Sequence, residues 1–442
     1  MKLDLIAFAS PLHDRESIWK ARRSFVEGLR AFSDLRIFSD SEYAARTAGR
    51  EAPAKETESG SAAVFFPTED SGASRENPVP DREALQAVFI ASGGTEEMFL
   101  QRLPMLEQPL VILSDGYHNS LAASFEICSW LEANGYEHHF LHLPEEADSA
   151  RRQAFRDRLT GIHDRVLLRR RMAGMRLGLI GGSSGWLIAS QIDRTAVSRE
   201  TGLEFVDLPM SVLTERFEAL KRSGRDFEND PLTVQLAPHL VPERSRTDLA
   251  EAVALYHALR EICAENRLDA VTVKCFDLLA PCRTTTCLAM ALLNDEGTVA
   301  GCEGDIPSVY TMLTLKILSG RPGFMANPSS ADRSRLTVDF AHCTLPLSFG
   351  SEFRLPSHFE SGMGIGIQAR VPEGPCTILK IGGQNLDRKF ACTGRLVACP
   401  QVPQRCRTQV RFRFDSLADF DRFMANRLGN HVILARGEVN LP

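Results

Sequence analysis

Two acidic side chains, Glu303 and Asp305, follow a predicted strand over residues 298–302 and precede a predicted helix over 307–319. In open α/β sheets, ligands bind outside the carboxyl ends of the strands, so these carboxylates stand where metal binding or acid-base chemistry usually occurs. Glycines on either side of the Cys302-Glu303 pair let the backbone approach a ligand closely. Asp305 could also cap the helix, because a proline stands at the first helical position, and the two roles are compatible.

Two histidines complete a set of groups that could bind a metal ion. His342 ends a predicted strand, where a buried strand would favour an apolar residue, and His431 begins another. Each histidine alone is more often a hydrogen-bonded core or surface residue than a ligand. With Glu303 and Asp305, however, they form a mixed oxygen and nitrogen set, which suits Mn²⁺ or Mg²⁺ better than thiolate-bound zinc. The set predicts a divalent-metal site at the strand ends.

A third histidine, His358, stands two residues before Glu360. If this segment is extended, both side chains point to one side. The pair could then supply a base or contact a substrate, although a solvated strand edge is the alternative.

Polar loops at other strand ends are further candidates for binding a polar ligand. The loops that contain Ser92 and Asn119 could contact a substrate, but their residue types also suit ordinary turns. The loop over 182–185 lies between a predicted strand over 177–181 and a helix predicted to begin near Trp186, which is the context of an anion site. It lacks the GxGxxG and GK[ST] patterns, so an ordinary tight turn is favoured.

Alternating strands and helices predict the α/β class, with mostly parallel sheets covered by helices on both faces. After Pro328, short alternating segments between Gly, Pro and Asp turns predict an antiparallel sheet or barrel. We therefore expect three domains, over 1–173, 174–328 and 329–442. The predicted strands cover 3–9, 87–91, 110–113, 138–143, 177–181, 270–274, 298–302, 336–340, 363–369, 376–381, 408–414 and 431–435. The predicted helices include 120–132, 245–265, 286–293 and 307–319.

Composition narrows the class of protein. The chain has 442 residues, with 43% hydrophobic and 24% charged residues, which is typical of globular proteins. A net charge of -6 gives no reason to expect a nucleic-acid partner. No run of 18 apolar residues or signal-peptide pattern predicts a membrane segment, and eleven cysteines without CxxC pairs suggest a reducing, cytoplasmic location. The polar stretch over 44–81 predicts a mobile surface excursion.

The order of several motifs resembles the L-fucose and L-arabinose isomerase family, and most closely its shorter fucose-isomerase-like members. The motifs are Cys302-Glu-Gly-Asp305 with the following helix, Ser319-Gly-Arg-Pro322, His342-Cys-Thr-Leu-Pro346 and Gly429-Asn-His431, with Ser92-Gly-Gly-Thr95 and Asn119-Ser120 in the first domain. No single motif is decisive, and their order carries the resemblance.

This resemblance implies two Rossmann-like, doubly wound α/β domains followed by a β-rich, barrel-like C-terminal domain. It also implies a homo-oligomer, a trimer or hexamer, with active sites near subunit boundaries, and aldose-ketose isomerisation of a small-molecule sugar on a divalent metal, usually Mn²⁺. Glu303 matches the family's metal-binding and proton-transferring glutamate, and His431 matches its C-terminal ligand histidine. His342 corresponds to the ligand histidine of the arabinose branch.

One position departs from the family pattern. Where the family has a second acidic ligand, after the helix that follows Glu303, this chain has Asn327. Its carbonyl oxygen can bind a metal, but an amide cannot act as a general base at neutral pH. Either Asp305, Asp332 or Glu360 supplies the second carboxylate, or the reaction differs from simple isomerisation.

The sequence thus predicts a metal-dependent isomerase of a pentose, a 6-deoxyhexose or a related sugar that works through an ene-diol. Glu303 would be a metal ligand and the acid-base group, and Asp305 a proton relay or orienting group. His342, His431 and, more weakly, Asn327 would be the other ligands. One alternative is another ene-diolate enzyme, an aldolase or epimerase on a modified or phosphorylated sugar. The other is a non-catalytic sugar-binding protein.

Overall fold

The computed structural model describes residues 1–442 except 21, 48–82, 145, 427 and 442. Most of the predicted excursion over 44–81 therefore lies outside the described residues. The chain forms two compact units, Met1–Leu167 and Leu168–Leu441, and helix α6 (Ser149–Met172) runs across their boundary.

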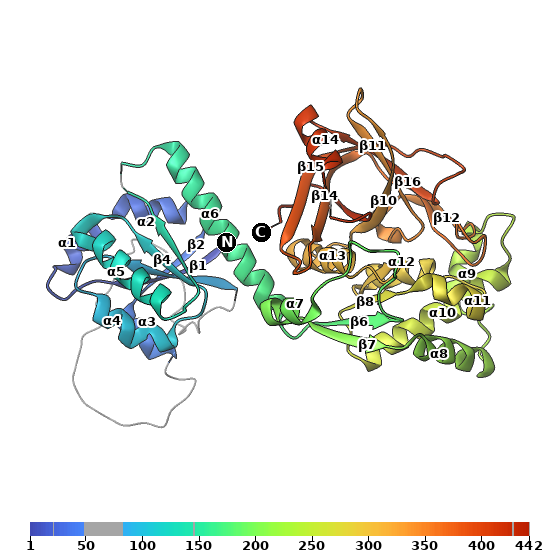
Figure 1. The fold of residues 1–442 in the computed structure, drawn as a ribbon, viewed down its shortest axis with the longest axis horizontal. Coiled ribbons are helices and arrows are strands. Elements are labelled where there is room, and N and C mark those ends of the chain that lie inside the picture. Colours follow the sequence, from blue (N-terminus) through green and yellow to red (C-terminus); the bar gives the residue numbers. More distant parts are fainter. Residues whose placement is uncertain (21, 48–82, 145, 427, 442) are drawn as a thin grey trace. The chain divides into compact units, whose positions relative to one another are not determined.

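Unit 1 contains a five-stranded parallel sheet in the order β2-β1-β3-β4-β5 (Figure 1). The strands are β1 (Lys2–Phe8), β2 (Asp34–Ser39), β3 (Ala84–Ile90), β4 (Leu110–Ser114) and β5 (His138–His142). The helices are α1 (Arg15–Lys20), α2 (Arg23–Arg30), α3 (Asp40–Thr47), α4 (Glu96–Arg102), α5 (Ser120–Ala133) and α6.

The central strands of unit 1 bury both faces, as their continuous apolar sequences lead us to expect for a covered parallel sheet. In β1, Leu3 and Leu5 belong to one core, which residues of α1, α2 and α6 complete. Ile6 and Phe8 belong to the core on the other face, with residues of α3, α4 and α5. Side chains alternate between faces along a strand, so β1 holds both helical layers together.

Unit 2 begins with a four-stranded parallel sheet in the order β7-β6-β8-β9. The strands are β6 (Arg176–Ile180), β7 (Glu204–Leu208), β8 (Ala270–Val273) and β9 (Val299–Cys302). The helices are α7 (Arg194–Thr201), α8 (Met210–Arg222), α9 (Pro231–Leu236), α10 (Arg246–Glu265), α11 (Leu279–Cys282), α12 (Cys287–Glu296) and α13 (Ile306–Ser319).

The helix predicted to begin near Trp186 is wrong. Residues 181–193 form a loop, and the next helix, α7, begins at Arg194. Asp193 caps this helix by accepting a hydrogen bond from the Ala196 amide, so the effective start signal lies further along the chain than the glycine-rich segment. Gly181 has a φ of +79° and its neighbour one of +77°, which ends strand geometry without starting a helix.

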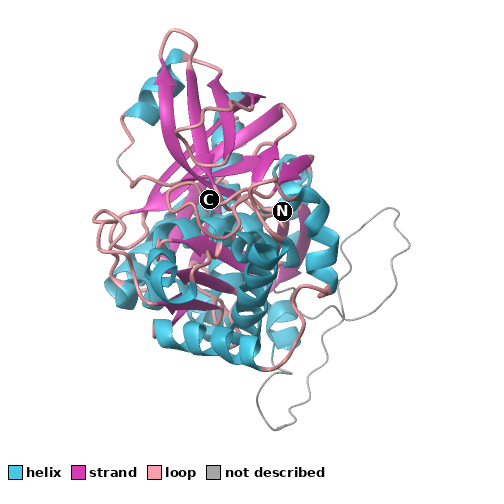
Figure 2. Ribbon diagram, turned by 90° about the vertical axis from the view of Figure 1, so that its right-hand side faces the viewer, coloured by secondary structure: helices cyan, strands magenta, loops and turns pink. Residues whose placement is uncertain are grey.

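The rest of unit 2 is a closed antiparallel barrel in the order β10-β11-β16-β15-β14-β17 (Figure 2, magenta strands). Its strands are β10 (Phe324–Asp332), β11 (Thr337–His342), β14 (Gly374–Gly382), β15 (Arg388–Ala398), β16 (Thr408–Phe414) and β17 (Val432–Arg436). The short strands β12 (Glu352–Arg354) and β13 (Gln368–Arg370) pair separately, and α14 (Leu417–Met424) precedes β17.

Helix α13 lies between the barrel and the second parallel sheet (Figure 1), in contact with β8, β9, β14 and β17. One continuous hydrophobic core includes residues of this sheet, of α13 and of the barrel. This shared core explains why the two layers form one compact unit.

The predicted fold class, parallel α/β sheets covered by helices and a β-rich C-terminal region, is confirmed. The division into three domains stays a prediction. In the described part of the chain, no helix has the length and apolar character needed to cross a membrane.

Candidate metal site

Glu303 lies in the tight loop between β9 and α13, and its backbone is left-handed, with a φ of +65°. Such a φ is uncommon for residues other than glycine, and it is often found at functional sites. The next residue, Gly304, also has a φ of +65°, and a Cβ there would approach the Gly182 carbonyl oxygen to 2.4 Å. The Glu303 loop is therefore packed directly against the loop that follows β6.

Asp305 is the N-cap of α13, as predicted, and its side chain is fully buried. Its Oδ1 accepts a hydrogen bond from the Ser308 amide (3.1 Å), and its Oδ2 accepts one from the Ser308 hydroxyl (2.7 Å). Oδ2 also contacts Nδ1 of His431 at 2.8 Å. The cap thus has a second function, because it fixes the orientation of an imidazole.

The two predicted ligand histidines converge on one carboxylate oxygen. Nε2 of His431 lies 3.6 Å from Oε1 of Glu303, and Nε2 of His342 lies 3.9 Å from the same oxygen. Nδ1 of His342 is 2.8 Å from the hydroxyl of Thr344, so each ring is held by its other nitrogen. Both histidines are buried, and the Glu303 side chain is 14% exposed.

The pKa values in this cluster follow from burial opposed by close charges. Burial acts to raise the pKa of Glu303, but His342 and His431 hold it well below its usual range. Burial acts to lower the pKa of His431, yet Asp305 and Glu303 raise it to about 9. Burial lowers the pKa of His342. Glu303 is therefore ionised at neutral pH, which a metal ligand requires.

Lys380 is a fully buried cation behind Asp305. Its Nζ donates a hydrogen bond to the Ser308 hydroxyl at 2.8 Å and lies 3.7 Å from Oδ2 of Asp305. Burial lowers the pKa of Lys380, while Asp305 opposes this shift. An unpaired buried carboxylate is costly, so this lysine stabilises Asp305 in the charged form that orients His431.

Glu303, His342 and His431 fit a divalent metal ion. One ligand atom from each residue lies within 4.8 Å of the other two. Nε2 of His431 is buried and has no hydrogen-bond partner among the described residues, which leaves its lone pair available once the nitrogen is deprotonated. A carboxylate that holds the distal nitrogen of a ligand histidine is a recurrent feature of metal sites, and Asp305 has this position.

Asn327 stands next to this cluster in the strand register. Asn327 pairs with Ala341, the neighbour of His342, and it follows Ala326, which pairs with Val432, the neighbour of His431. Oδ1 of Asn327 is buried without a hydrogen-bond partner in the described part of the chain. An unsatisfied buried carbonyl oxygen is unusual, and it is consistent with the predicted role as an additional ligand.

The segment with His358 and Glu360 is a turn rather than extended, because the Gly362 amide donates to the His358 carbonyl oxygen (3.0 Å). The condition for both side chains pointing to one side is therefore not met. Both still lie within electrostatic reach of Glu303: burial and the charge of Glu303 raise the pKa of Glu360. Burial, with His342, lowers the pKa of His358 to about 4, so this imidazole is neutral at physiological pH.

Ser92 and Asn119 belong to unit 1. The Ser92 hydroxyl is buried and accepts a hydrogen bond from the Ser10 amide (2.8 Å). Asn119 is exposed, has a left-handed backbone and precedes α5. The cluster in unit 2 does not include either residue, and their role in substrate binding stays a prediction.

Sequence reasoning missed two residues of the site, Trp186 and Lys380. The Trp186 indole N–H donates to Oε2 of Glu303 at 3.3 Å. A tryptophan directly after a glycine-rich loop at a strand end is a usable signal for the first. A lysine inside the apolar strand Gly374–Gly382 is a usable signal for Lys380, because buried lysines are rare unless paired.

The geometry defines a class of site, two imidazoles and a carboxylate at the carboxyl edge of a parallel sheet. No protein-family model matches the chain. A sulfoquinovose isomerase from Clostridium sp. (strain MSTE9) is 30% identical over 92 residues, which is 21% of this chain and 21% of that protein. The chain thus matches about a fifth of the length of this curated relative.

Proposed function

We propose that the protein is a metal-dependent sugar isomerase that interconverts an aldose and a ketose. The observation that carries this proposal is the convergence of Glu303, His342 and His431, with a buried imidazole nitrogen that lacks a partner among the described residues. The partial similarity to a sulfoquinovose isomerase supports the same class of reaction. Mn²⁺ is the metal we propose first, since the donor set mixes imidazole nitrogen and carboxylate oxygen.

A divalent metal held by Glu303, His342 and His431 would polarise the sugar carbonyl and acidify the neighbouring C–H group. In the proposed reaction, a carboxylate removes the proton from C2 of the open-chain aldose, and an ene-diol forms. The oxygen on C1 takes up the proton that the hydroxyl on C2 gives up, and return of a proton to C1 gives the ketose. Glu303 is ionised at neutral pH and partly exposed, which supports its assignment as a base as well as a ligand.

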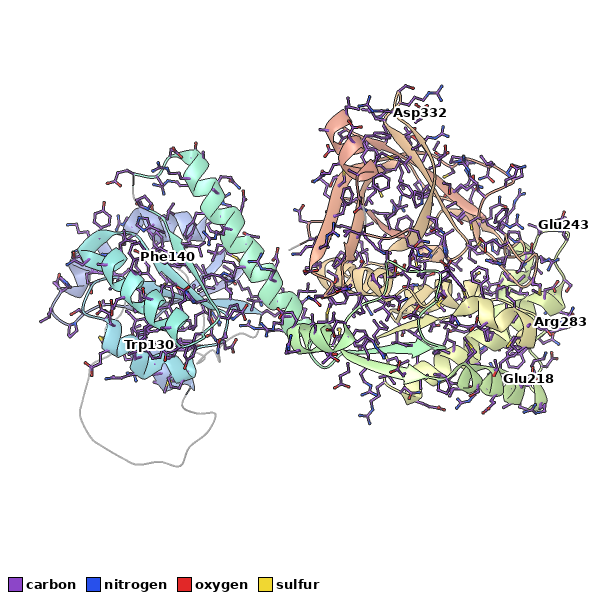
Figure 3. All side chains as sticks on the ribbon, in the orientation of Figure 1. Trp130, Phe140, Glu218, Glu243, Arg283 and Asp332 are labelled. Atoms are coloured by element: carbon purple, nitrogen blue, oxygen red, sulfur yellow. The ribbon has the colours of Figure 1, made fainter. Side chains whose placement is uncertain are left out.

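Glu360 is the best candidate for the missing second carboxylate. Its raised pKa makes it easier to protonate than Glu303, which suits a group that returns a proton to the substrate. Asp305 is fully buried and engaged by Ser308 and His431, and Asp332 lies at the outer tip of the β10–β11 hairpin (Figure 3). We therefore assign Asp305 to orienting His431 and give Asp332 no role in the reaction.

The decisive experiment combines metal analysis of the purified protein with a sugar panel in D₂O. The panel contains pentoses, 6-deoxyhexoses and their acidic derivatives, and it includes sulfoquinovose because of the similar protein's name. We expect bound or stimulating Mn²⁺, and product NMR that shows solvent deuterium at C1 or C2 without carbon-bond cleavage. Absence of any metal, together with no stimulation by Mn²⁺, contradicts the proposal.

The same experiment separates the two alternatives. An aldolase yields fragments with a broken carbon bond, and an epimerase returns an aldose or ketose with one inverted centre. A non-catalytic sugar-binding protein binds saccharide after EDTA treatment and exchanges no deuterium. The convergent ligand atoms favour the isomerase over this last reading, because sugar binding alone does not require them.

Asn327 and the assembly are two further parts of the proposal. If Asn327 contributes its amide oxygen to the metal, then Asn327→Asp adds a ligand charge and should tighten Mn²⁺ binding on the order of tenfold, whereas Asn327→Ala should weaken it. Isothermal calorimetry compares the two variants.

The proposed trimer or hexamer is tested by light scattering of the purified protein.

A further inference from the structure

Three ring side chains form a continuous series that begins at Glu303. Trp186 contacts Phe276 edge to face, with ring centroids 5.5 Å apart and an interplanar angle of 90°. Phe276 contacts His358 in turn, at 5.9 Å and 73°. These rings come from three separate segments: the loop after β6, the turn after β8 and the segment between β12 and β13. None of these ring contacts is needed to hold the metal ligands.

The two oxygens of Glu303 have different partners. Oε1 faces the imidazole nitrogens of His342 and His431, whereas Oε2 accepts the hydrogen bond from the Trp186 indole. A carboxylate on a flexible side chain can rotate, and a donor on one oxygen restricts that rotation. The indole therefore presents Oε1 to the ligand cluster.

The loop that carries Trp186 is fixed at its base and open at its tip. Its base packs against Gly304. A Cβ added at Gly304 would lie only 2.9 Å from Ser183 Cα, so the two loops are in close backbone contact. Further along, Trp186 is 51% exposed, although its N–H is engaged with Glu303. Half of a large aromatic surface thus faces solvent next to the candidate ligand cluster.

We propose that Trp186 is a positioning residue for Glu303 and one wall of the sugar-binding site. Its indole N–H holds Oε2, and its exposed ring, continued by Phe276 and His358, provides the surface on which the C–H face of the sugar packs. Ligand sites commonly combine such aromatic walls with a few fixed polar groups. This inference rests on the proposed function, since the ligand is the sugar of that reaction.

Two substitutions separate the two roles. Trp186→Phe keeps an aromatic ring and removes the N–H. The turnover number kcat should fall about 10–100-fold, as is typical when a metal ligand loses its hydrogen-bond partner, while KM changes little. Trp186→Ala removes both, so KM should also rise about tenfold. Trp130→Phe, on α5 of unit 1, is the matched control and should leave both constants unchanged. Wild-type kcat in Trp186→Phe overturns the positioning role, and unchanged KM in Trp186→Ala overturns the wall.

A spectroscopic test does not depend on turnover. The chain has 3 tryptophans, so the Trp19→Phe, Trp130→Phe double variant leaves Trp186 as the single emitter. Its fluorescence should change saturably with Mn²⁺ alone, with the midpoint that calorimetry gives for metal binding. Unchanged emission while calorimetry registers binding overturns the inference.

A failure of the proposed function looks different. If calorimetry detects no metal binding and no sugar is isomerised, the proposed function fails. The contact is then judged in metal-free protein, where adding Glu303→Gln to the single-tryptophan variant should shift the emission of Trp186. An identical spectrum with and without that substitution overturns the Trp186 contact.

Discussion

The two units carry charged clusters at the carboxyl ends of their parallel sheets, and these clusters differ in how completely their groups are paired. In unit 1, the cluster is built on Arg22 and Asp115. In unit 2, it is built on Glu303, His342 and His431. Both include a residue with left-handed backbone: His118, whose Nδ1 lies 3.4 Å from Nη2 of Arg22, and Glu303. Backbone conformation alone therefore does not tell a site from a structural cluster.

The cluster of unit 1 pairs one positive charge with one negative charge. Arg22 is 1% exposed, and its Nε lies 2.8 Å from Oδ2 of Asp115. Its other nitrogens donate to the carbonyl oxygens of Ile18 (2.9 Å) and Ala91 (2.6 Å). Oδ1 of Asp115 accepts a hydrogen bond from the Ser120 hydroxyl at 3.0 Å. Arg22 Nε and Asp115 Oδ2 are buried and meet as an ion pair without hydrogen-bond geometry. Each charge nevertheless faces one opposite charge, so the pair holds three loops together.

The cluster of unit 2 is paired at its back and open at its front. Asp305, Ser308 and Lys380 satisfy one another, whereas the Nε2 atoms of His342 and His431 both face a single carboxylate oxygen. Such an arrangement leaves donor atoms that converge without matching partners. The comparison teaches that convergence of several ligand atoms, rather than the presence of buried charge, marks the candidate site.

Replacing Glu303 should have the largest effect on activity. Glu303→Gln removes the charge that we propose binds the metal and the group that we propose moves the proton, so turnover at saturating Mn²⁺ should fall about 10²–10⁴-fold. The measurement is kcat on the sugar that the panel identifies. Asp115→Asn makes the same carboxylate-to-amide change in unit 1, and its folded fraction should keep wild-type turnover. Full activity in Glu303→Gln would remove the distinction between the clusters.

Breaking the Arg22–Asp115 ion pair should instead cost stability. Asp115→Asn leaves the Arg22 charge buried without its counter-charge, which typically costs about 3–5 kcal/mol. Denaturant unfolding followed in unit 1 measures this loss. A double variant, Arg22→Met with Asp115→Leu, should recover most of it, because both buried charges are then gone. If the double variant is as unstable as the single one, the pair has a role beyond mutual neutralisation.

Local sequence signals, together with the order of the motifs, pointed to the residues of the open cluster. Glu303 and Asp305 follow a strand and precede a helix, and His342 and His431 lie at strand ends, so each position could be inferred from neighbouring residues. The cap at Asp305 and most strands of the parallel sheets were predicted for the same reason. These features depend on short-range patterns, which a single sequence contains.

Long-range contacts could not be predicted in this way. Trp186 meets Glu303 across 117 positions, and Lys380 meets Ser308 across 72, so neither contact has a local signature. The turn at His358 depends on Gly362, whose positive φ lets the chain reverse there. Closure of the barrel likewise requires β10 to pair with β17, strands about a hundred residues apart.

Asp305 joins the paired back of the unit 2 cluster to its open front. In Asp305→Asn, the amide accepts only a weaker hydrogen bond from His431 Nδ1. The imidazole should then be less firmly oriented and less basic, and Mn²⁺ affinity should fall about 10–100-fold. Calorimetric titration of metal-free protein measures the change. Ser416→Ala removes a comparable helix cap, at α14, and serves as the control that should leave affinity unchanged. Equal affinity in Asp305→Asn would reduce Asp305 to a helix cap.

A partly exposed ion pair should show the smallest effect, and its pH dependence has a definite sign. Asp339 accepts hydrogen bonds from Arg411 (2.6 Å) and Arg405 (2.8 Å), and both arginines are partly exposed. Burial acts to raise the pKa of Asp339, but the arginines lower it overall. Because its pKa is lower in the folded state, the ionised carboxyl stabilises the fold at pH values above its unfolded-state pKa. This contribution disappears as the pH falls through the folded-state pKa.

At pH 7, Asp339→Asn should therefore unfold with a free energy about 1 kcal/mol lower than wild type, less than for a fully buried pair because solvent screens the arginines. Below about pH 4 the gap should begin to close, because the carboxyl of the unfolded chain then takes up protons, and it closes further as the folded carboxyl becomes neutral at lower pH. Denaturant unfolding at several pH values measures the gap. A gap that stays constant down to pH 2 would mean that packing, rather than charge, accounts for the contribution of Asp339.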